Sequence, residues 1–294
     1  MKKILAFLLC LTLAFAVACN GGSSDSVNDS SAVDSRDKIS SEQSESGDSS
    51  DINKYRPDYD YGTCKQLRGD VLIVLFFLDD FESKWTRDDI SRFTTNEVMP
   101  ALRFLERSAE SHGVELSFTT DTNYGITYNG EVIRSAHESD YVTADTLRQA
   151  VKELYYNSDT DFIAQMKQVH GVDEVVCFTI FNKDGTAYAL NPKRDSEFTF
   201  EEHCLLFVRD HHTEDAMPAG HMASVTAHEM LHLFGAEDYY APESRKKLAQ
   251  KHMPNDIMIR TAYDLSENEF GDTTAFYIGW TDKLPEIIKK EEWN

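Results

Sequence analysis

Two histidines, His228 and His232, stand four positions apart in the run His228-Glu229-Met230-Leu231-His232. On an α-helix this spacing places both side chains on one face, about 40° apart around the axis and one turn apart along it. Their ring nitrogens can then reach a single divalent ion at about 2.0–2.1 Å. Glu229 is rotated by about 100° from His228, so it lies beside the ion and can act as general base on a water molecule bound to it. The pattern therefore indicates a catalytic metal site.

The residues that follow extend this pattern. Gly235, three positions after His232, is suited to end the helix in the left-handed conformation that glycine adopts without a Cβ clash. The chain can then turn back and present Asp238 as a third ligand. Two neutral imidazoles and one carboxylate leave the fourth tetrahedral position of a zinc ion open for water, which is typical of catalytic rather than structural zinc. Glu237 is the alternative third ligand, because it is adjacent and equally hard.

The run from His228 to Asp238, H-E-x-x-H-x-x-G-x-x-D, resembles the metzincin superfamily of zinc endopeptidases, in the version that carries Asp where most members have a third His. The resemblance covers roughly Met222 to Trp280. It implies one catalytic zinc ion held by His228, His232 and Asp238.

The resemblance also implies a methionine turn downstream of the ligands. Met258, in Asn255-Asp256-Ile257-Met258, is the candidate, and Met253, which Pro254 follows, is the alternative. A helix near 273–280 is expected to close the lower half of the molecule. Where some metzincins have a tyrosine close to the zinc, this chain has Arg260, so the residue that stabilises the oxyanion is not assigned.

The N-terminus predicts where the protein works. Lys2-Lys3 precede an apolar run, Ile4 to Ala18, that is too short for a comfortable membrane span and suits a signal peptide, residues 1–18. Ala16-Val17-Ala18-Cys19 resembles a bacterial lipobox, which implies acylation of Cys19 and a lipid anchor. We expect a bacterial lipoprotein on the extracytoplasmic side of the cell membrane or outer membrane. If Cys19 is not lipidated, the protein is expected to be secreted.

Residues 19–53 are predicted to form a disordered tether. From Asn20 to Asn53 the chain contains twelve serines and eight acidic residues but no aromatic residue. Such a composition buries too little apolar surface to offset the entropy of ordering. The following residues, 54–294, are predicted to be the catalytic domain, most simply a monomer. The net charge of −22 argues against nucleic acid as a partner.

The element pattern predicts a mixed layout of helices and strands before the metal-binding helix. It agrees with the metzincin resemblance, which implies an α+β fold with a mixed sheet and helices above a cleft, then the active-site helix and a smaller C-terminal subdomain. Val71 to Leu78 is an apolar run suited to a buried strand, and Asn129-Gly130 within Ile126 to Ile133 is typical of a β-hairpin. The other predicted helices are 87–111, 144–156 and 161–169, and the other predicted strands are 174–181, 187–190 with a turn at Asp184-Gly185, and a strand at Leu205.

These observations favour a zinc-dependent endopeptidase that hydrolyses peptide bonds of extracytoplasmic proteins, with Glu229 as general base on the zinc-bound water. One alternative is a surface lipoprotein that binds metal without turnover. Another is a gluzincin-like peptidase in which a distant glutamate, Glu243 or Glu267, replaces Asp238. Pairing among Cys64, Cys177 and Cys204 cannot be predicted from the sequence, and buried free thiols are equally compatible with it.

Overall fold

Five strands form one mixed sheet in the computed structural model, which describes residues 52, 55–56, 62–131, 134, 140–191, 201–209 and 220–293. The order across the sheet is β2-β1-β3-β5-β4. β1, β2, β3 and β5 run parallel, whereas β4 pairs antiparallel with β5. The bounds are β1 (Gly69–Asp79), β2 (Leu116–Thr127), β3 (Glu174–Asp184), β4 (Tyr188–Leu190) and β5 (His203–Arg209). The predicted mixed sheet is therefore confirmed.

The interior strand β1, between β2 and β3, is apolar along its length because helices cover both faces of the sheet. Ile73, Leu75 and Phe77 belong to a core shared with α2, α3 and α6. Leu72, Val74 and Phe76 alternate with them and belong to a second core shared with α4 and α5. A parallel strand covered on both sides is expected to be continuously hydrophobic, as the predicted strand at 71–78 is.

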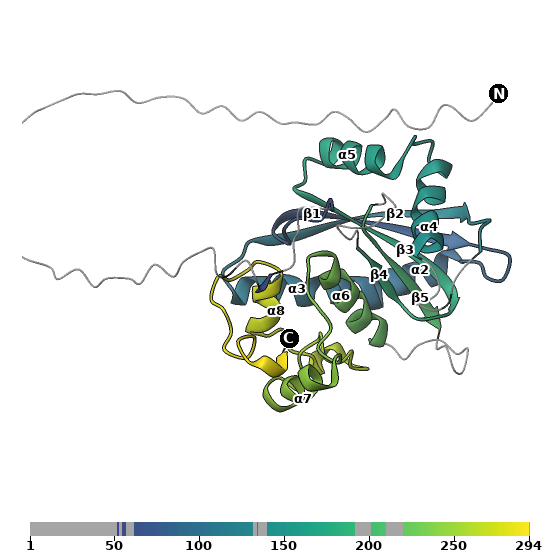
Figure 1. Ribbon diagram of the computed structural model, residues 1–294. Helices are drawn as coiled ribbons and strands as arrows, with labels where there is room; N and C mark the ends of the chain where they lie inside the picture. Colours follow the sequence, from purple (N-terminus) through teal and green to yellow (C-terminus); the bar gives the residue numbers. More distant parts are fainter. Residues whose placement is uncertain are drawn as a thin grey trace, which may run out of the picture. The chain divides into compact units, whose positions relative to one another are not determined.

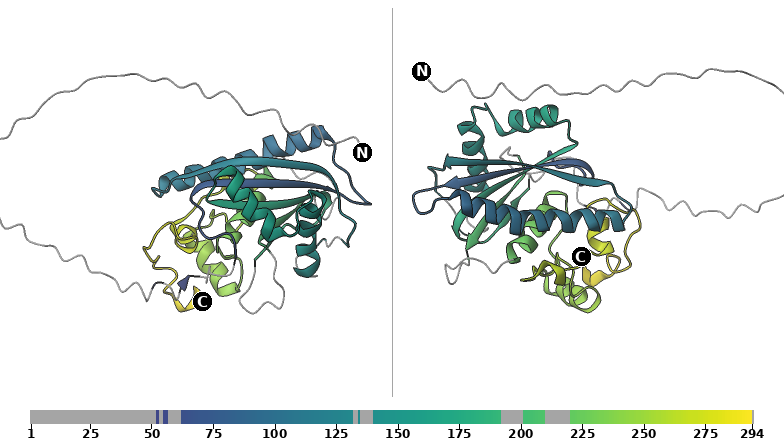
Figure 2. Two further views of the ribbon diagram at one scale, coloured as in Figure 1. Left: turned by 90° about the horizontal axis from the view of Figure 1, so that it is seen from above. Right: turned by 180° about the vertical axis from the view of Figure 1, so that it is seen from behind.

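The helices between the strands match the predicted segments closely. α2 (Arg87–Phe93), a π-helical segment η3 (Thr94–Val98) and α3 (Met99–Ser111) together fill the predicted helix at 87–111. α4 (Asp140–Glu153) and α5 (Asp159–His170) lie on the opposite side of the sheet (Figures 1 and 2). Helices thus alternate with parallel strands, so this half is organised as α/β layers rather than as the segregated helices and strands of the predicted α+β class.

The predicted hairpin after β2 is not seen in the residues that the structure describes, and residues 132–133 lie outside them. No strand follows β2 within residues 128–131, because the backbone N–H of Tyr128 donates to Asp79 O and the ring of Tyr128 packs against Phe181. The predicted hairpin around Asn129-Gly130 is therefore absent from the described residues. β4 lies where it was predicted, and β5 separates it from β3 in the sheet.

The C-terminal part contains α6 (His221–Leu233), α7 (Glu243–His252), η4 (Leu265–Glu267), α8 (Asp272–Tyr277) and η5 (Glu291–Trp293). These elements lie on the side of the sheet that α3 also covers (Figure 1). They share one apolar core with β1 and α3, and Trp280 Nε1 donates to Leu67 O at 2.6 Å. The predicted smaller lower half is thus packed directly onto the upper half.

The predictions for residues 1–51, including the signal peptide, Cys19 and most of the tether, lie outside the described residues. Ile52 and Tyr55 are described, and both pack against the core beneath α3 and α6. Within the described part of the chain, no helix combines the length and hydropathy that a membrane crossing requires.

Candidate metal centre

The helix α6 carries His228, Glu229 and His232 through the interior of the protein. Its residues are apolar or small on nearly every side, and ten of its thirteen positions are buried. The helix ends where Gly235 adopts a φ of 97°, with its N–H donating to His232 O at 3.0 Å. The N–H of Ala236 donates back to Leu231 O at 3.1 Å, which satisfies a terminal carbonyl and turns the chain toward Asp238.

Three side chains converge at the end of this helix. His228 Nε2 and His232 Nε2 lie 3.1 Å apart, and each lies 3.2 Å from Asp238 Oδ1. Among the described residues, these three form the group of His, Cys, Asp and Glu side chains that is compact enough to hold one metal ion. The side chain of His228 is almost fully buried, and that of Asp238 is about one-third exposed, so the centre opens to solvent on the Asp238 side.

The other ring nitrogens determine which atoms face the centre. His228 Nδ1 lies 2.9 Å from Ile257 O, and His232 Nδ1 lies 2.7 Å from Ala236 O. A carbonyl accepts only, so each Nδ1 carries a proton, and each Nε2 of a neutral ring then presents a lone pair. Histidine ligands of metals are commonly oriented by such a bond to a backbone carbonyl. This arrangement suits a metal ion bound through both Nε2 atoms.

Asp238 Oδ1 is buried and has no hydrogen-bond partner, although both Nε2 atoms are 3.2 Å away. The contacts therefore lack hydrogen-bond geometry. Two lone pairs and a carboxylate oxygen at this separation repel one another unless a positive charge lies between them. The donor set of two imidazoles and one carboxylate is one that zinc accepts, so the residues present fit this ion.

The pKa values of these groups also indicate that positive charge is favoured here. Burial acts to raise the pKa of Asp238, but the two imidazoles outweigh it and lower that pKa well below its usual range. Burial acts to lower the pKa of His232, whereas Asp238 and Glu229 together raise it to about 9. Both shifts have the same cause, because the imidazoles and the carboxylates lie close enough for a positive charge among them to be stabilised.

Glu229 lies next to this centre without joining it. Its side chain is 9% exposed, and it is not one of the three converging groups. Its charge nevertheless acts on His232 and on the phenol of Tyr240. A buried carboxylate beside the ligands is a suitable position for a proton acceptor.

A tight turn at Asp256, Ile257 and Met258 supports both ligand segments. Ile257 O accepts from His228, and Met258 O accepts from the N–H of Tyr239, the neighbour of Asp238, at 2.9 Å. Asp256 is 1% exposed and accepts from the backbone N–H of Met258 at 2.9 Å. Met258 itself is fully buried. The backbone of the residue expected to form the methionine turn is thus bonded to the neighbour of Asp238.

The alternative ligands point elsewhere. Glu237 pairs with Arg245 at 2.7 Å, Glu243 with Lys247 at 3.8 Å, and Glu267 with Arg260 at 3.6 Å. Met253, the alternative turn methionine, directly follows α7. Cys64, Cys177 and Cys204 are buried free thiols, and burial raises the pKa of each.

Tyr240 is a residue of this site that the sequence pattern did not single out. It is about half exposed, and burial, a hydrogen bond with Asp238 and the charge of Glu229 raise the pKa of its phenol. The ring of Tyr263, by contrast, packs at a tilt against that of His221, with the ring centroids 4.9 Å apart, and it is not among the groups at the cluster. The signal that could have identified Tyr240 is its position two residues after the expected third ligand.

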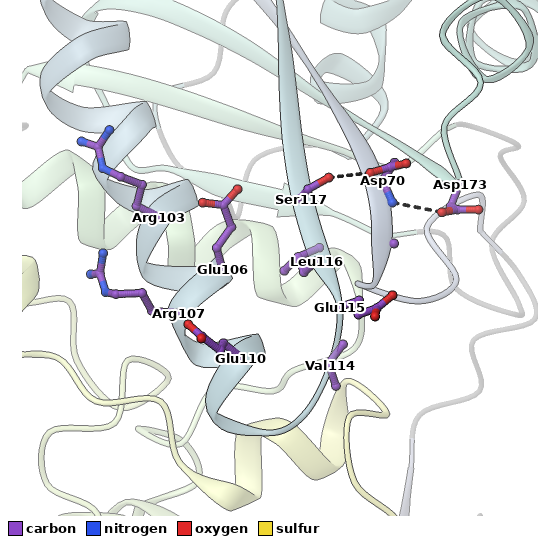
Figure 3. Close-up of a pocket in the computed structure, with 11 residues that line it drawn as sticks. Asp70, Arg103, Glu106, Arg107, Glu110, Val114, Glu115, Leu116, Ser117 and Asp173 are labelled. Atoms are coloured by element: carbon purple, nitrogen blue, oxygen red, sulfur yellow. Dashed lines mark hydrogen bonds between the residues drawn. The ribbon is translucent and has the colours of Figure 1, made fainter. Parts of the chain in front are cut away.

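A separate cavity of about 900 Å³ lies between α3 and the amino ends of β1 and β2 (Figure 3). Its polar groups hydrogen-bond to one another: Ser117 Oγ donates to Asp70 at 2.5 Å, and the N–H of Asp70 donates to Asp173 at 3.0 Å. The lining includes none of the converging ligands. We therefore place the candidate site at the end of α6 and not in this cavity.

Neither a protein-family model nor a curated protein matches the chain. Among solved structures, the crystal structure of metalloproteinase-II from Bacteroides fragilis is similar at 15% sequence identity with a TM-score of 0.37. The similarity covers 78% of this chain and 59% of that one, so this chain matches less than two-thirds of that structure's length. A likeness of this extent does not establish a common activity.

Proposed function

We propose that the protein is a zinc-dependent endopeptidase. The observation that carries the proposal is the convergence of His228 Nε2, His232 Nε2 and Asp238 Oδ1 within 3.1–3.2 Å, with both Nδ1 atoms occupied by backbone carbonyls. Three protein ligands leave one position for water or substrate, as in catalytic zinc sites. The metzincin-like sequence pattern around these residues supports the same reading.

The roles follow from the positions of the side chains. His228, His232 and Asp238 would hold the zinc ion, which would supply a Lewis acid that acidifies water and polarises the scissile carbonyl. Glu229 would accept the proton of the attacking water and deliver it to the leaving amine. As an anionic ligand, Asp238 would leave the ion less electrophilic than a third histidine would.

We propose proteins or peptides outside the cytoplasm as substrates, with the enzyme attached to a membrane through a lipid on Cys19. This part of the proposal rests on the lipobox-like sequence alone. It predicts that Cys19→Ser abolishes partitioning of the mature protein into a detergent phase. If the wild-type protein also stays in the aqueous phase, secretion without an anchor is the better description.

The replacement Glu229→Gln tests the catalytic role directly. It should leave one zinc ion per chain but lower the rate of hydrolysis of an unstructured protein such as casein by about 10²- to 10⁴-fold, because the proton acceptor is removed. Glu237→Gln is the matched control, since this neighbouring carboxylate pairs with Arg245 instead. It should retain wild-type activity.

Three outcomes would argue against this function in different ways. Wild-type protein that binds zinc but cleaves nothing would favour the non-catalytic metal-binding lipoprotein. Undiminished hydrolysis by Glu229→Gln would show that Glu229 is not the proton acceptor. Retention of stoichiometric zinc by Asp238→Ala would favour a different third ligand.

A further inference from the structure

The amino end of the metal-binding helix α6 has no capping side chain of its own. The residue at the cap position is Gly220, with a φ of 89°. A Cβ at this position would lie 3.2 Å from Tyr263 O, so a Ser, Thr or Asp would not fit there in the usual capping conformation. The first N–H groups of α6 need another acceptor, because they have no partner within the helix.

Glu97 supplies that acceptor from a distant part of the chain. The N–H of Gly220 lies 3.1 Å from both Glu97 Oε1 and Oε2, and the N–H of Ala223 donates to Oε2 at 2.9 Å. The side chain is 8% exposed. A carboxylate at a helix amino end interacts favourably with the aligned peptide dipoles, and more strongly when it is partly buried.

The local backbone around Glu97 is adapted to this contact. Glu97 lies in the π-helical segment Thr94–Val98, between the regular helices α2 and α3. A π-helical turn is less favourable than an α-helical turn and occurs often at functional sites. Burial raises the pKa of Glu97, and the amide donors of Gly220 and Ala223 with the charge of His221 act in the opposite direction. Two unfavourable features, the π turn and the buried carboxylate, thus coincide at one contact.

The helix α6 itself connects this contact to the candidate metal ligands. Ala223 and His228 are five residues apart on the same helix, which corresponds to about 7.5 Å along the axis. The carboxyl end of α6 is held by the bonds of His228 and His232 to Ile257 O and Ala236 O. Glu97 holds the amino end, so the two ends together determine where the histidine rings lie.

We propose that Glu97 is a positioning residue for the metal centre, which fixes α6 through its amino end and thereby sets the geometry of His228 and His232. This inference rests on the proposed function, because it concerns the affinity of the same site for zinc. The capping contact and the ring positions can be measured without metal.

The test compares Glu97→Gln, which keeps the side-chain volume and removes the charge, with Glu106→Gln. Glu106 is a matched control because it lies on the same long helix and accepts the N–H of Phe118, in β2, at 3.3 Å without touching α6. Zinc affinity is measured by competition with a chromophoric chelator. In the metal-free proteins, hydrogen exchange of the Gly220 and Ala223 amides and the NMR signals of the His228 and His232 rings are recorded.

Glu97→Gln should accelerate exchange at both amides, shift the ring signals of both histidines and weaken zinc binding by about 3- to 10-fold, the size expected for the loss of one helix cap. Glu106→Gln should change none of the three. Glu97→Asp, which keeps the charge but is one methylene shorter, provides a second variant if Glu97→Gln does not fold, and it should give the same changes at reduced size.

The outcomes separate this inference from the proposed function. Unchanged ring signals and unchanged zinc affinity in a variant whose Gly220 and Ala223 amides exchange faster would overturn the positioning role, even if the wild-type protein is an active zinc peptidase. Wild-type protein that binds no zinc would overturn the proposed function, whereas a shift of the histidine signals on Glu97→Gln would still support the positioning role.

Discussion

The buried carboxylate of Asp256 holds the turn that supports the candidate metal centre. Its carboxylate accepts from the backbone N–H groups of Met258 and Gly271 and from Thr274 Oγ1, at 2.9–3.1 Å. Burial nevertheless raises its pKa to about 6. Ile257 O, in the same turn, lies 2.9 Å from His228 Nδ1, so the carboxylate that holds this turn is linked to one of the candidate ligands.

Asp256→Asn should lower the free energy of unfolding by about 2 kcal/mol, since the amide nitrogen would face donors in place of an acceptor. It should also weaken zinc binding by about tenfold or more, as is usual when a group supporting a histidine ligand is altered. Chemical denaturation and chelator competition measure the two effects. Asp264→Asn is the control, because that exposed carboxylate caps only η4. A variant with normal stability and normal zinc affinity would contradict the role given to Asp256.

The site residues that could be predicted from the sequence are those that depend on one helix and its end. His228, Glu229, His232 and Gly235 are related by helical periodicity, and Asp238 lies just beyond the turn. Glu97 and Asp256 could not be predicted in the same way, because each acts through contacts with backbone far away in the sequence. No local pattern distinguishes a buried capping carboxylate from a solvated one.

The end of α4 shows strain that a single substitution can relieve. Tyr155 has a φ of 67° and is 96% exposed. Its N–H donates to Lys152 O and the N–H of Tyr156 donates to Val151 O, which is the bonding pattern that usually places glycine at this position. Because the tyrosine ring is exposed, its burial does not offset the free-energy cost of the left-handed conformation.

Tyr155→Gly should therefore raise the free energy of unfolding by about 1 kcal/mol, the approximate cost of the left-handed conformation for a residue with a Cβ. Glu153→Gly, two residues earlier and still in the helix, should lower it by about 0.5–1 kcal/mol. Thermal unfolding of the two variants should show shifts in opposite directions. Destabilisation by both would mean that the Tyr155 ring has a packing role.

Elements with a clear hydrophobic periodicity agree with the sequence prediction. The helix at 87–111 has the predicted outer bounds, although periodicity did not reveal the π-helical segment within it. The Asn129-Gly130 pair is not followed by a strand in the described residues, where the N–H of Tyr128 donates to Asp79 O and the ring of Tyr128 packs against Phe181. Pairing of β4 with β5 is likewise a property of the assembled sheet.

The stability of the molecule as a whole should depend on the protonation of His203. The ring is fully buried beneath α4, with Nε2 3.2 Å from Thr143 O. Burial, opposed by hydrogen bonds to Glu201 and Thr143, lowers the pKa of His203 from 6.5 to about 4. Between these values the unfolded chain binds more protons than the folded one, so stability falls as the pH is lowered.

The titration of His203 should thus lower the free energy of unfolding by about 3 kcal/mol as the pH falls from 6.5 to 4. The His203→Gln variant should be less stable at pH 7. Its free energy of unfolding should also lack the pH dependence that His203 causes in the wild-type protein. Asp256, whose raised pKa gives the opposite slope between pH 3.8 and about 6, is present in both proteins and cancels in the difference. Parallel pH profiles for the two proteins would contradict the shift of His203.

X-ray absorption of the zinc-loaded protein, with its zinc content, tests the central claim most directly. We predict one zinc ion per chain, bound to nitrogen and oxygen at about 2.0–2.1 Å, and loss of this ion in His228→Ala, His232→Ala and Asp238→Ala. A chain that takes up no zinc, or one whose zinc has sulfur neighbours at about 2.3 Å, would contradict a centre formed by His228, His232 and Asp238.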